Sequence, residues 1–539
     1  MLKSADRLLF AIAAVFIAAY FLFLTHASLD AYFTPDDMMN LYRSWSPPIG
    51  ELIRSNLLFI FSSTFMRPMG SVWYRTLYDF AGFNPAPFHF ANLLILLANI
   101  FLTYCVSRRL TGSRLTGALA ALLNCYHPGL AWLYFDTGYV YDVLCYFFYF
   151  AALLCYLRIR QEGRVPGFWG FAGLIALYVC ALNSKEMALT LPVTLFIYEL
   201  VYHSPRSPRW LLQEGRATLV LGLLTVAFLI GHARGSASLL QNARYQPVFT
   251  WQRFMETGGH FFNSLFDQDG SLAPVPMLFV WAMLFAIAWI THSKTLKFSW
   301  LFLMLSVAPI AFVPPRGMPQ YYIPWFGWTL YLAVALVSAI EYLLPRLPGP
   351  VRAAALVAVV AAILFPLYRG IGFGQVTTVT LEAPEVRSIV NQLHRLRPSF
   401  PPRARILFLN DPAPANAYDL LFMVSVQLWR QYVCRPRQNH DSTAGCGGAI
   451  RVRHRIRLPG QAFCRCHPTS TTAGHPARFH GVLPRRLESR HRCPSRQARR
   501  THHRQGRGSW PNPSGGACGS TVSIAALFRS SAFPGRCAG

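Results

Sequence analysis

The sequence predicts an all-α polytopic membrane protein with about eleven transmembrane helices. Of its 539 residues, 53% are hydrophobic and only 13% are charged, and its mean hydropathy is +0.31. Soluble domains contain about 25% charged residues, so this composition excludes an ordinary water-soluble enzyme. Long apolar runs recur along the first 370 residues, and a run of about 20 residues is what a helix needs to cross a bilayer core.

Eleven runs have a length and composition that suit a membrane span. The first is not followed by a small-residue cleavage site, so we expect a retained helix and not a removed signal peptide. The approximate limits of the runs are 7–26, 86–106, 115–134, 138–157, 167–183, 186–203, 217–235, 272–292, 298–315, 320–344 and 351–369.

The basic residues in the short loops predict the orientation of the chain. With the N-terminus in the cytoplasm, the inner segments carry fifteen lysines and arginines, whereas the short outer turns carry only Lys185 and Arg316. Lysine and arginine accumulate in short cytoplasmic loops. We therefore expect a cytoplasmic N-terminus and an extracytoplasmic C-terminus, in what we take to be a bacterial inner membrane.

The composition divides the chain into three parts. Residues 1–370 form the predicted transmembrane domain, and residues 371–430 look like the start of a small extracytoplasmic α/β segment. In that segment we expect a short amphipathic helix over 384–397 and a strand over 405–410. The predicted α/β segment is incomplete, because the composition changes near Arg430.

The tail, residues 431–539, has 19 arginines, no lysine and only two acids. This abrupt change favours translation in a shifted reading frame. A disordered basic extension that binds nucleic acid or lipid headgroups is a second interpretation, but an extracytoplasmic tail would not meet nucleic acid, so we expect no nucleic-acid partner. A third is a metal module, although its spacing is a poor zinc pattern; it would use Cys464, Cys466, His467, His491 and Cys493.

Charged residues near the outer ends of the predicted spans point to one polar site at the outer face. A charge at membrane depth is costly, so it usually faces a cavity or a partner. If the segments converge, they bring together Asp36, Asp37, Arg67, Asp136, Asp142, Lys185, Glu186 and Arg316.

The doublet Asp36-Asp37 follows the first span closely, and Pro35 before it constrains the local backbone. An ionised aspartate there could take a proton from an attacking hydroxyl. Alternatively, an aspartate at this position could cap the helix that begins nearby. Both roles could coexist in two neighbouring acids.

A second cluster lies at the tight outer turn Asn183-Ser184-Lys185-Glu186. Lys185 could hold a phosphate as a point charge, with Glu186 tuning it or binding a metal. The alternative is a neutralised pair at the water interface. Arg67 and Arg316 could likewise be phosphate ligands or interface anchors.

His89 and Asp136 are weaker candidates, because such residues are more often structural than catalytic. No glycine-rich loop that would bind a nucleotide phosphate is present.

Several short motifs follow one another along the first 200 residues. They are Pro35-Asp36-Asp37, Arg67-Pro68-Met69-Gly70, the segment 83–92 (FNPAPFHFAN), Ser184-Lys185-Glu186, Pro192 and Tyr198-Glu199. In this order they resemble the GT-C superfamily of polyprenyl-phosphate-sugar-dependent glycosyltransferases, in its protein O-mannosyltransferase and TMTC-type branch. The resemblance covers about residues 1 to 370. TMTC-type proteins carry helical repeats after the membrane region, and no internal repeat is visible here.

The resemblance implies an inverting sugar transfer at the outer face of the membrane. Asp36 or Asp37 would act as the base on a hydroxyl of a protein or glycolipid acceptor. The leaving lipid phosphate would need cationic groups, for which Arg67, Lys185 and Arg316 are the candidates. Some GT-C relatives use a divalent metal, so a metal ion is a further possible cofactor.

Two other classes of protein stay open. Charges near membrane depth also mark the translocation pathways of transporters and lipid-linked-sugar flippases. Against a transporter, the acids cluster at one face, and no Gly/Pro-broken spans are repeated in two halves. A non-catalytic envelope assembly protein that keeps the fold is the third candidate.

Overall fold

The computed structural model describes residues 2–57, 67–205, 207–234, 246–266, 272–369, 383–396, 406–408 and 524–526. Nearly all of these residues are helical, which confirms the predicted class. The chain divides into two units, the first made of residues 1–404 with 413–448 and the second of residues 405–412 with 449–539.

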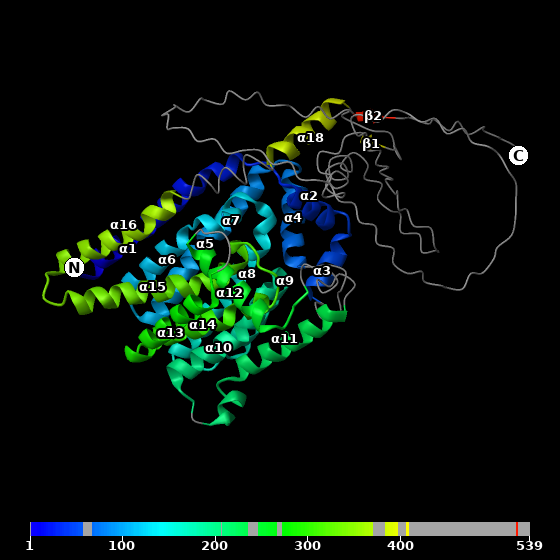
Figure 1. Cartoon of the computed structure of the whole chain (residues 1–539). Coiled ribbons are helices and arrows are strands. Elements are labelled where there is room, and N and C mark those ends of the chain that lie inside the picture. Colours follow the sequence, from blue (N-terminus) through cyan, green and yellow to red (C-terminus); the bar gives the residue numbers. More distant parts are fainter. Residues whose placement is uncertain are drawn as a thin grey trace, which may run out of the picture. The chain divides into compact units, whose positions relative to one another are not determined.

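The helices of the first unit form a bundle (Figure 1). Short 3-10 turns connect several of them. The helices are α1 (Leu2–Thr25), α2 (Pro35–Trp45), α3 (Ile49–Leu57), α4 (Pro68–Ala81), α5 (Ala86–Thr111), α6 (Arg114–Cys125), α7 (Ala131–Phe135), α8 (Val140–Gln161), α9 (Phe168–Ser184), α10 (Leu191–Tyr198), α11 (Arg216–Arg234), α12 (Trp251–Leu265), α13 (Pro274–Ile290), α14 (Lys294–Ser306), α15 (Tyr322–Leu343), α16 (Gly349–Arg369) and α18 (Ala383–Leu396).

Four stretches of the described residues are long and apolar enough to cross a membrane as continuous helices. They are Ala11–Asp30, Ala86–Thr111, Thr137–Gln161 and Met318–Leu343. Shorter apolar helices cover Phe168–Ser184, Arg216–Gly231, Pro274–Ile290 and Ala354–Pro366. Each of these eight overlaps one of the eleven runs that the sequence marks as candidate spans.

The other three runs, 115–134, 186–203 and 298–315, fold as interrupted helices, which the apolar pattern does not show. In the first, α6 ends at Cys125 and His127 is extended before Pro128 opens a 3-10 turn. A residue before proline is pushed out of the α conformation, so the break follows from the sequence. The second run begins as a 3-10 turn and ends in a π-helical turn at Glu199–His203.

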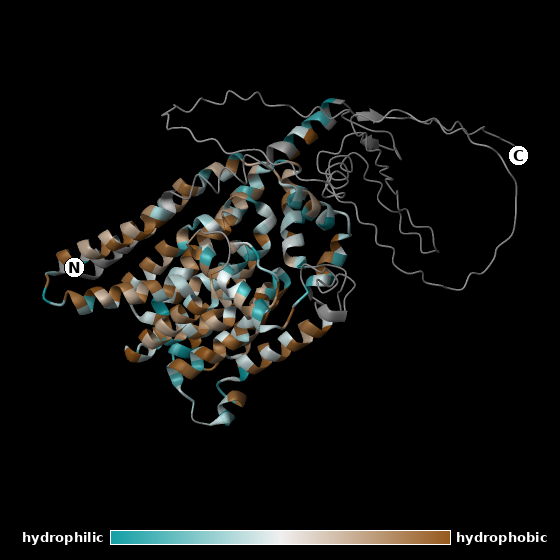
Figure 2. Cartoon of the chain, viewed as in Figure 1, coloured by the Kyte–Doolittle hydropathy of each residue, from teal (hydrophilic) through white to brown (hydrophobic). Residues whose placement is uncertain are grey.

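Aromatic side chains fill the centre of the bundle. Helix α5 packs against α6 and α8, and α15 packs against α14 and α6. The ring centroids of Tyr146 and Tyr322 lie 4.1 Å apart, and those of Phe150 and Phe326 lie 4.5 Å apart. Figure 2 shows that hydrophobic residues predominate along these helices, as expected where both the core and the lipid are apolar.

Both elements predicted for the segment after the bundle are present. Helix α18 buries Val386, Ile389 and Val390, the single apolar face of an amphipathic helix. The predicted strand is β1 (Ile406–Phe408), and it pairs antiparallel with β2 (Ile524–Ala526). The other residues of 397–430 and of the tail, including the candidate metal ligands there, lie outside the described residues.

A buried ion pair joins the ends of α8 and α10 that the sequence places on the cytoplasmic side. Arg160 donates two hydrogen bonds to Glu199, from Nε to Oε1 at 2.8 Å and from Nη2 to Oε2 at 3.1 Å. The Tyr156 hydroxyl also donates to Glu199 Oε1, at 2.8 Å. Glu199 is fully buried, so its charge depends on these donors.

We predict that Glu199→Ala lowers the free energy of unfolding by about 3 kcal/mol, because Arg160 would be left buried without its counter-charge. The measurement is the thermal unfolding midpoint of the purified protein in detergent. The control is Glu162→Ala, which breaks an exposed pair with Arg164 and should leave the midpoint nearly unchanged, because water screens such a pair. Equal midpoints for the two variants would contradict the prediction.

Candidate active site

Asp37 is held in a fully buried position at the start of α2. Its Oδ2 accepts a hydrogen bond from the Thr34 backbone amide at 2.9 Å, and Thr34 Oγ1 accepts one from the Asp37 amide at 3.4 Å. This reciprocal arrangement is a capping box. Oδ1 accepts from the hydroxyls of Tyr74 and Thr137, each at 2.6 Å. Burial raises the pKa of Asp37, and these hydrogen bonds oppose the rise.

Asp36, the other member of the doublet, is exposed. Partial desolvation by the surrounding protein raises the pKa of its carboxyl, and the positive charge of Arg43 opposes that rise. A Cβ atom added at Gly138 would lie 3.3 Å from the Asp36 Cβ, so the turn before α8 lies against this residue. The doublet therefore divides into a buried structural acid and an accessible one.

Asp136 lies beside Asp37 and is also buried. Its Oδ1 accepts a hydrogen bond from the Gly138 amide at 2.8 Å and lies 3.1 Å from Thr34 Oγ1. Burial raises the pKa of Asp136 well above its usual range, and the charge of Asp37 raises it further. Asp136 thus shares the Thr34 hydroxyl with Asp37 and helps to fix the loop that carries Asp36.

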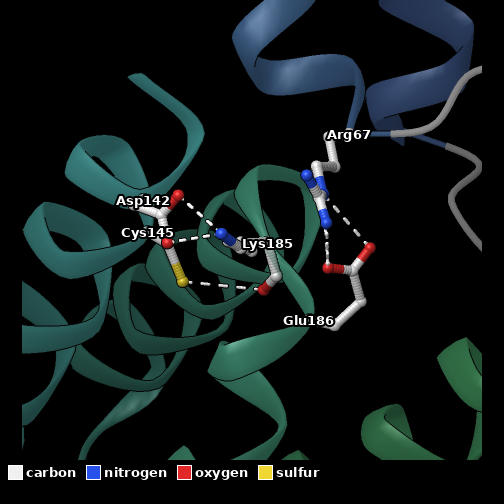
Figure 3. Close-up of polar contacts among 5 residues, drawn as sticks. All are labelled: Arg67, Asp142, Cys145, Lys185 and Glu186. Carbon is white, nitrogen blue, oxygen red and sulfur yellow. Dashed lines mark hydrogen bonds and ion pairs between the residues drawn. The ribbon is translucent and has the colours of Figure 1, made fainter. Parts of the chain in front are cut away.

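Arg67 and Glu186 form an ion pair between two segments that are far apart in the sequence (Figure 3). Arg67 Nη2 lies 2.8 Å from Glu186 Oε2, and Nε lies 3.2 Å from both carboxylate oxygens. Each side chain is about one-fifth exposed, at 19% and 22%. Arg67 precedes α4 with a left-handed backbone, φ 60° and ψ 59°, which directs the chain into Pro68 at the first turn of the helix.

Lys185 pairs with Asp142 of α8 (Figure 3). Its Nζ lies 2.5 Å from each carboxylate oxygen, and both side chains are less than one-tenth exposed. The alternative that Lys185 and Glu186 neutralise each other is therefore wrong. An extended backbone at Lys185, φ −161° and ψ 151°, sends neighbouring side chains in different directions, so each finds its own partner.

Tyr141 connects the Arg67–Glu186 pair with the acidic loop and precedes Asp142, the partner of Lys185, in α8. The Arg67 guanidinium lies over the Tyr141 ring, 5.8 Å from its centroid, and the Tyr141 hydroxyl donates to Asn40 Oδ1 of α2 at 3.1 Å. Its ring also lies 6.3 Å from that of Tyr74, the residue that donates to Asp37. The candidate active site is thus one connected group of side chains from α2, α4, α8 and the turn after α9.

Two further predicted residues have other surroundings. The Arg316 carbonyl accepts a hydrogen bond from His260 Nε2 of α12 at 3.0 Å, which positions its backbone. His89 on α5 is fully buried, and neither ring nitrogen has a hydrogen-bond partner among the described residues.

The prediction of site residues omitted several that complete the site. Asp142, which the sequence places at the outer face without assigning it a role, is the counter-ion of Lys185. Thr34, Tyr74, Thr137 and Tyr141 hold or connect the charged groups, but hydroxyls and rings are too common in this sequence to be recognised without the fold.

Residues 67–232 match the family described as dolichyl-phosphate-mannose-protein mannosyltransferase. This match supports the resemblance of the membrane domain to GT-C membrane glycosyltransferases, the class that the motifs predict. It begins at Arg67 and contains both ion pairs, whereas Asp36 and Asp37 lie before it.

Two solved structures are also similar to this chain, and both are ArnT from Cupriavidus metallidurans. The structure bound to undecaprenyl phosphate is 15% identical with a TM-score of 0.45, covering 77% of this chain and 85% of that one. The apo structure is 15% identical with a TM-score of 0.41, covering 79% and 85%. None of the curated proteins is significantly similar in sequence. Because the sequence identity and the TM-scores of both structures are low, we base the assignment to GT-C membrane glycosyltransferases on the family match alone.

We predict that Gly70→Ala disrupts the site, because the added methyl would lie 2.1 Å from the Tyr141 ring. Forcing such an overlap costs about 1 to 3 kcal/mol and would move the ring away from Arg67. The measurement is the thermal midpoint together with transfer activity in membranes. Gly173→Ala in α9 is the control, since nothing lies within 4 Å of its Cβ position. A Gly70→Ala protein as stable and active as that control would disprove the packing argument.

Proposed function

We propose that this protein transfers a sugar from a polyprenyl-phosphate donor to a hydroxyl of a protein or envelope glycolipid. The observation that carries the proposal is that an accessible acid, Asp36, and a cation, Arg67, both lie close enough to Tyr141 for their charges to act on it. A second cation, Lys185, pairs with Asp142, the next residue of α8. The reaction needs a base for the acceptor and positive charge for the leaving phosphate. The match to a mannosyltransferase family over residues 67–232 supports the same reaction class.

Asp36 is the proposed general base. It would take the proton of the acceptor hydroxyl while the oxygen attacks the anomeric carbon of the sugar. The bond from that carbon to the phosphate oxygen breaks, and the lipid phosphate leaves with the electron pair. A single displacement of this kind inverts the anomeric centre. Asp37 would act as a positioning residue, since all its recorded contacts hold the loop.

Arg67 and Lys185 are the proposed ligands of the donor phosphate. Both are paired with carboxylates in this structure, so the phosphate would compete with Glu186 and Asp142 for them. Such pairing keeps the cations in place and limits the cost of burying their charge. A lipid phosphate would then gain charge-assisted hydrogen bonds that strengthen as the leaving group develops negative charge.

The proposal leaves the roles of three other predicted residues, of a metal ion and of the membrane location to be stated. Arg316 stays a candidate for the donor phosphate, and His89 and Asp136 are best explained by structural roles. The described residues contain no group of three or more His, Cys, Asp or Glu side chains that could share a metal ion, so we assign no metal ligand. The proposed location is the extracytoplasmic face of a bacterial inner membrane.

We predict that Asp36→Asn lowers the transfer rate about 100- to 10,000-fold, the usual contribution of a general base. The assay uses membranes with radiolabelled polyprenyl-phosphate mannose, glucose or arabinose, followed by separation of protein and lipid fractions. Asp37→Asn is the comparison, because it weakens a buried hydrogen-bond network and should lower the thermal midpoint. Full activity of Asp36→Asn, or label absent from wild-type membranes with all three donors, would remove this mechanism.

The same base should give the activity a defined pH dependence. Asp36 acts only when ionised, so activity is lost as the pH falls through its pKa, which desolvation raises above the ordinary value of about 3.9. Because the charge of Arg43 lowers that pKa, Arg43→Gln should move the acidic limb of kcat/KM to higher pH. An unchanged limb in Arg43→Gln would argue against Asp36 as the titrating group.

Lys185 can be tested apart from stability with a pair of variants. Lys185→Gln leaves Asp142 buried without its cation and should cost about 3 kcal/mol or more of stability, whereas Lys185→Gln/Asp142→Asn should restore much of it. Both should bind the donor about 10- to 100-fold more weakly, the loss expected for one charged hydrogen bond. Normal donor binding by the stable double variant would exclude Lys185 as a phosphate ligand.

A further inference from the structure

A second group of cations lies at the opposite ends of α5 and α8, away from the candidate active site. Arg108 and Arg109 are in the last turn of α5, and Arg158 is in the last turn of α8. These two helices pack against each other. Three arginines from two helices therefore meet at the face that the sequence predicts to be cytoplasmic.

These arginines surround a cavity of about 410 Å³ that Cys105 and Leu154 also line. No acidic residue is among its described lining residues. Arg109 is engaged with Gln161, since Nη1 donates to Oε1 at 3.0 Å and the Gln161 amide returns a bond to the Arg109 carbonyl at 2.8 Å. Arg108 and Arg158 are exposed and form no hydrogen bond or ion pair within the described part of the chain. Their positive charges are available to a ligand.

An apolar groove continues from this cavity along the two helices. A neighbouring cavity of about 400 Å³ shares Leu154 and Arg158 with the first and is lined by Leu102, Ala151 and Cys155. Ala151 lies seven residues before Arg158, which is about 10 Å along a helix. The one acid in this lining, Glu162, is paired with Arg164. The site thus combines a cationic mouth with an apolar floor that extends into the membrane.

We propose that this site binds an anionic glycerophospholipid, with the phosphate between Arg108 and Arg158 and an acyl chain along Leu102, Ala151 and Leu154. Basic pockets between transmembrane helices suit anionic headgroups, and guanidinium groups suit phosphate oxygens. An alternative explanation is that each arginine stabilises the negative end of its helix dipole, which would account for one arginine at each helix end. It does not explain why the cavity between Arg108 and Arg158 adjoins a second cavity lined by Leu102, Ala151 and Cys155. The inference does not depend on the proposed glycosyl transfer.

The test compares lipid binding to the purified full chain by native mass spectrometry, with phosphatidylglycerol or phosphatidylcholine added at equal concentrations. We expect the wild type to retain phosphatidylglycerol preferentially. Arg108→Gln/Arg158→Gln should bind it at least about tenfold more weakly, because each basic residue at a membrane surface contributes substantially to anionic-lipid binding. Phosphatidylglycerol should also raise the thermal midpoint of the wild type but not that of the Arg108→Gln/Arg158→Gln variant.

The matched control is Arg209→Gln/Arg346→Gln, which removes two exposed charges predicted to lie on the same side of the membrane. It should bind phosphatidylglycerol like the wild type. Equal losses in both double variants would reduce the effect to overall charge and overturn the site. Displacement of the lipid by millimolar inorganic phosphate would indicate a simple phosphate site and would also overturn the proposal, whereas resistance to phosphate supports the role of the groove.

Discussion

A fully buried carboxylate must find its donors within the protein, and Asp37 finds them on three different elements. Thr34 lies in the loop after α1, Tyr74 in α4 and Thr137 before α8. Leaving such a group unpaired costs far more than the pairing gains, so these elements are constrained to meet at one point. Because Asp37 is fixed in this way, the backbone of the adjacent, exposed Asp36 is fixed as well.

The same constraint organises the cations. Lys185 is buried against Asp142 and Arg67 is largely covered against Glu186, and the Tyr141 ring contacts both Arg67 and the helix that follows the acidic loop. Gly70 is required because the ring occupies the space where a side chain would stand. Three residues of the motif that begins at Arg67 have separate roles. Arg67 supplies a charge, Pro68 begins α4, and Gly70 leaves room for the Tyr141 ring.

The sequence predicts those features that depend on local pattern. Apolar length located the helices, and the amphipathic spacing located α18 and the strand that follows it. Hydropathy alone missed the break of the run 115–134 before Pro128, since it averages over the interruption, although the proline itself was a local signal. Nor could the sequence pair Lys185 with Asp142, because the two residues are 43 positions apart in the chain, and adjacency in sequence left a pair with Glu186 as an open alternative. The division of Asp36 and Asp37 into accessible and buried acids required the fold of the loop.

The cations at the candidate active site are paired with carboxylates, whereas Arg108 and Arg158 at the far ends of α5 and α8 are exposed. At the candidate active site, each cation is enclosed and held by a carboxylate, so a ligand must compete for it and only a strongly charged, well-placed group can do so. At the far ends of α5 and α8, Arg108 and Arg158 face outward without such a competitor. Enclosed pairs favour selectivity over affinity, whereas open arginines beside an apolar groove favour stable attachment to surrounding lipid. The proposed donor phosphate and the proposed phospholipid would therefore meet two different kinds of cation in the same bundle.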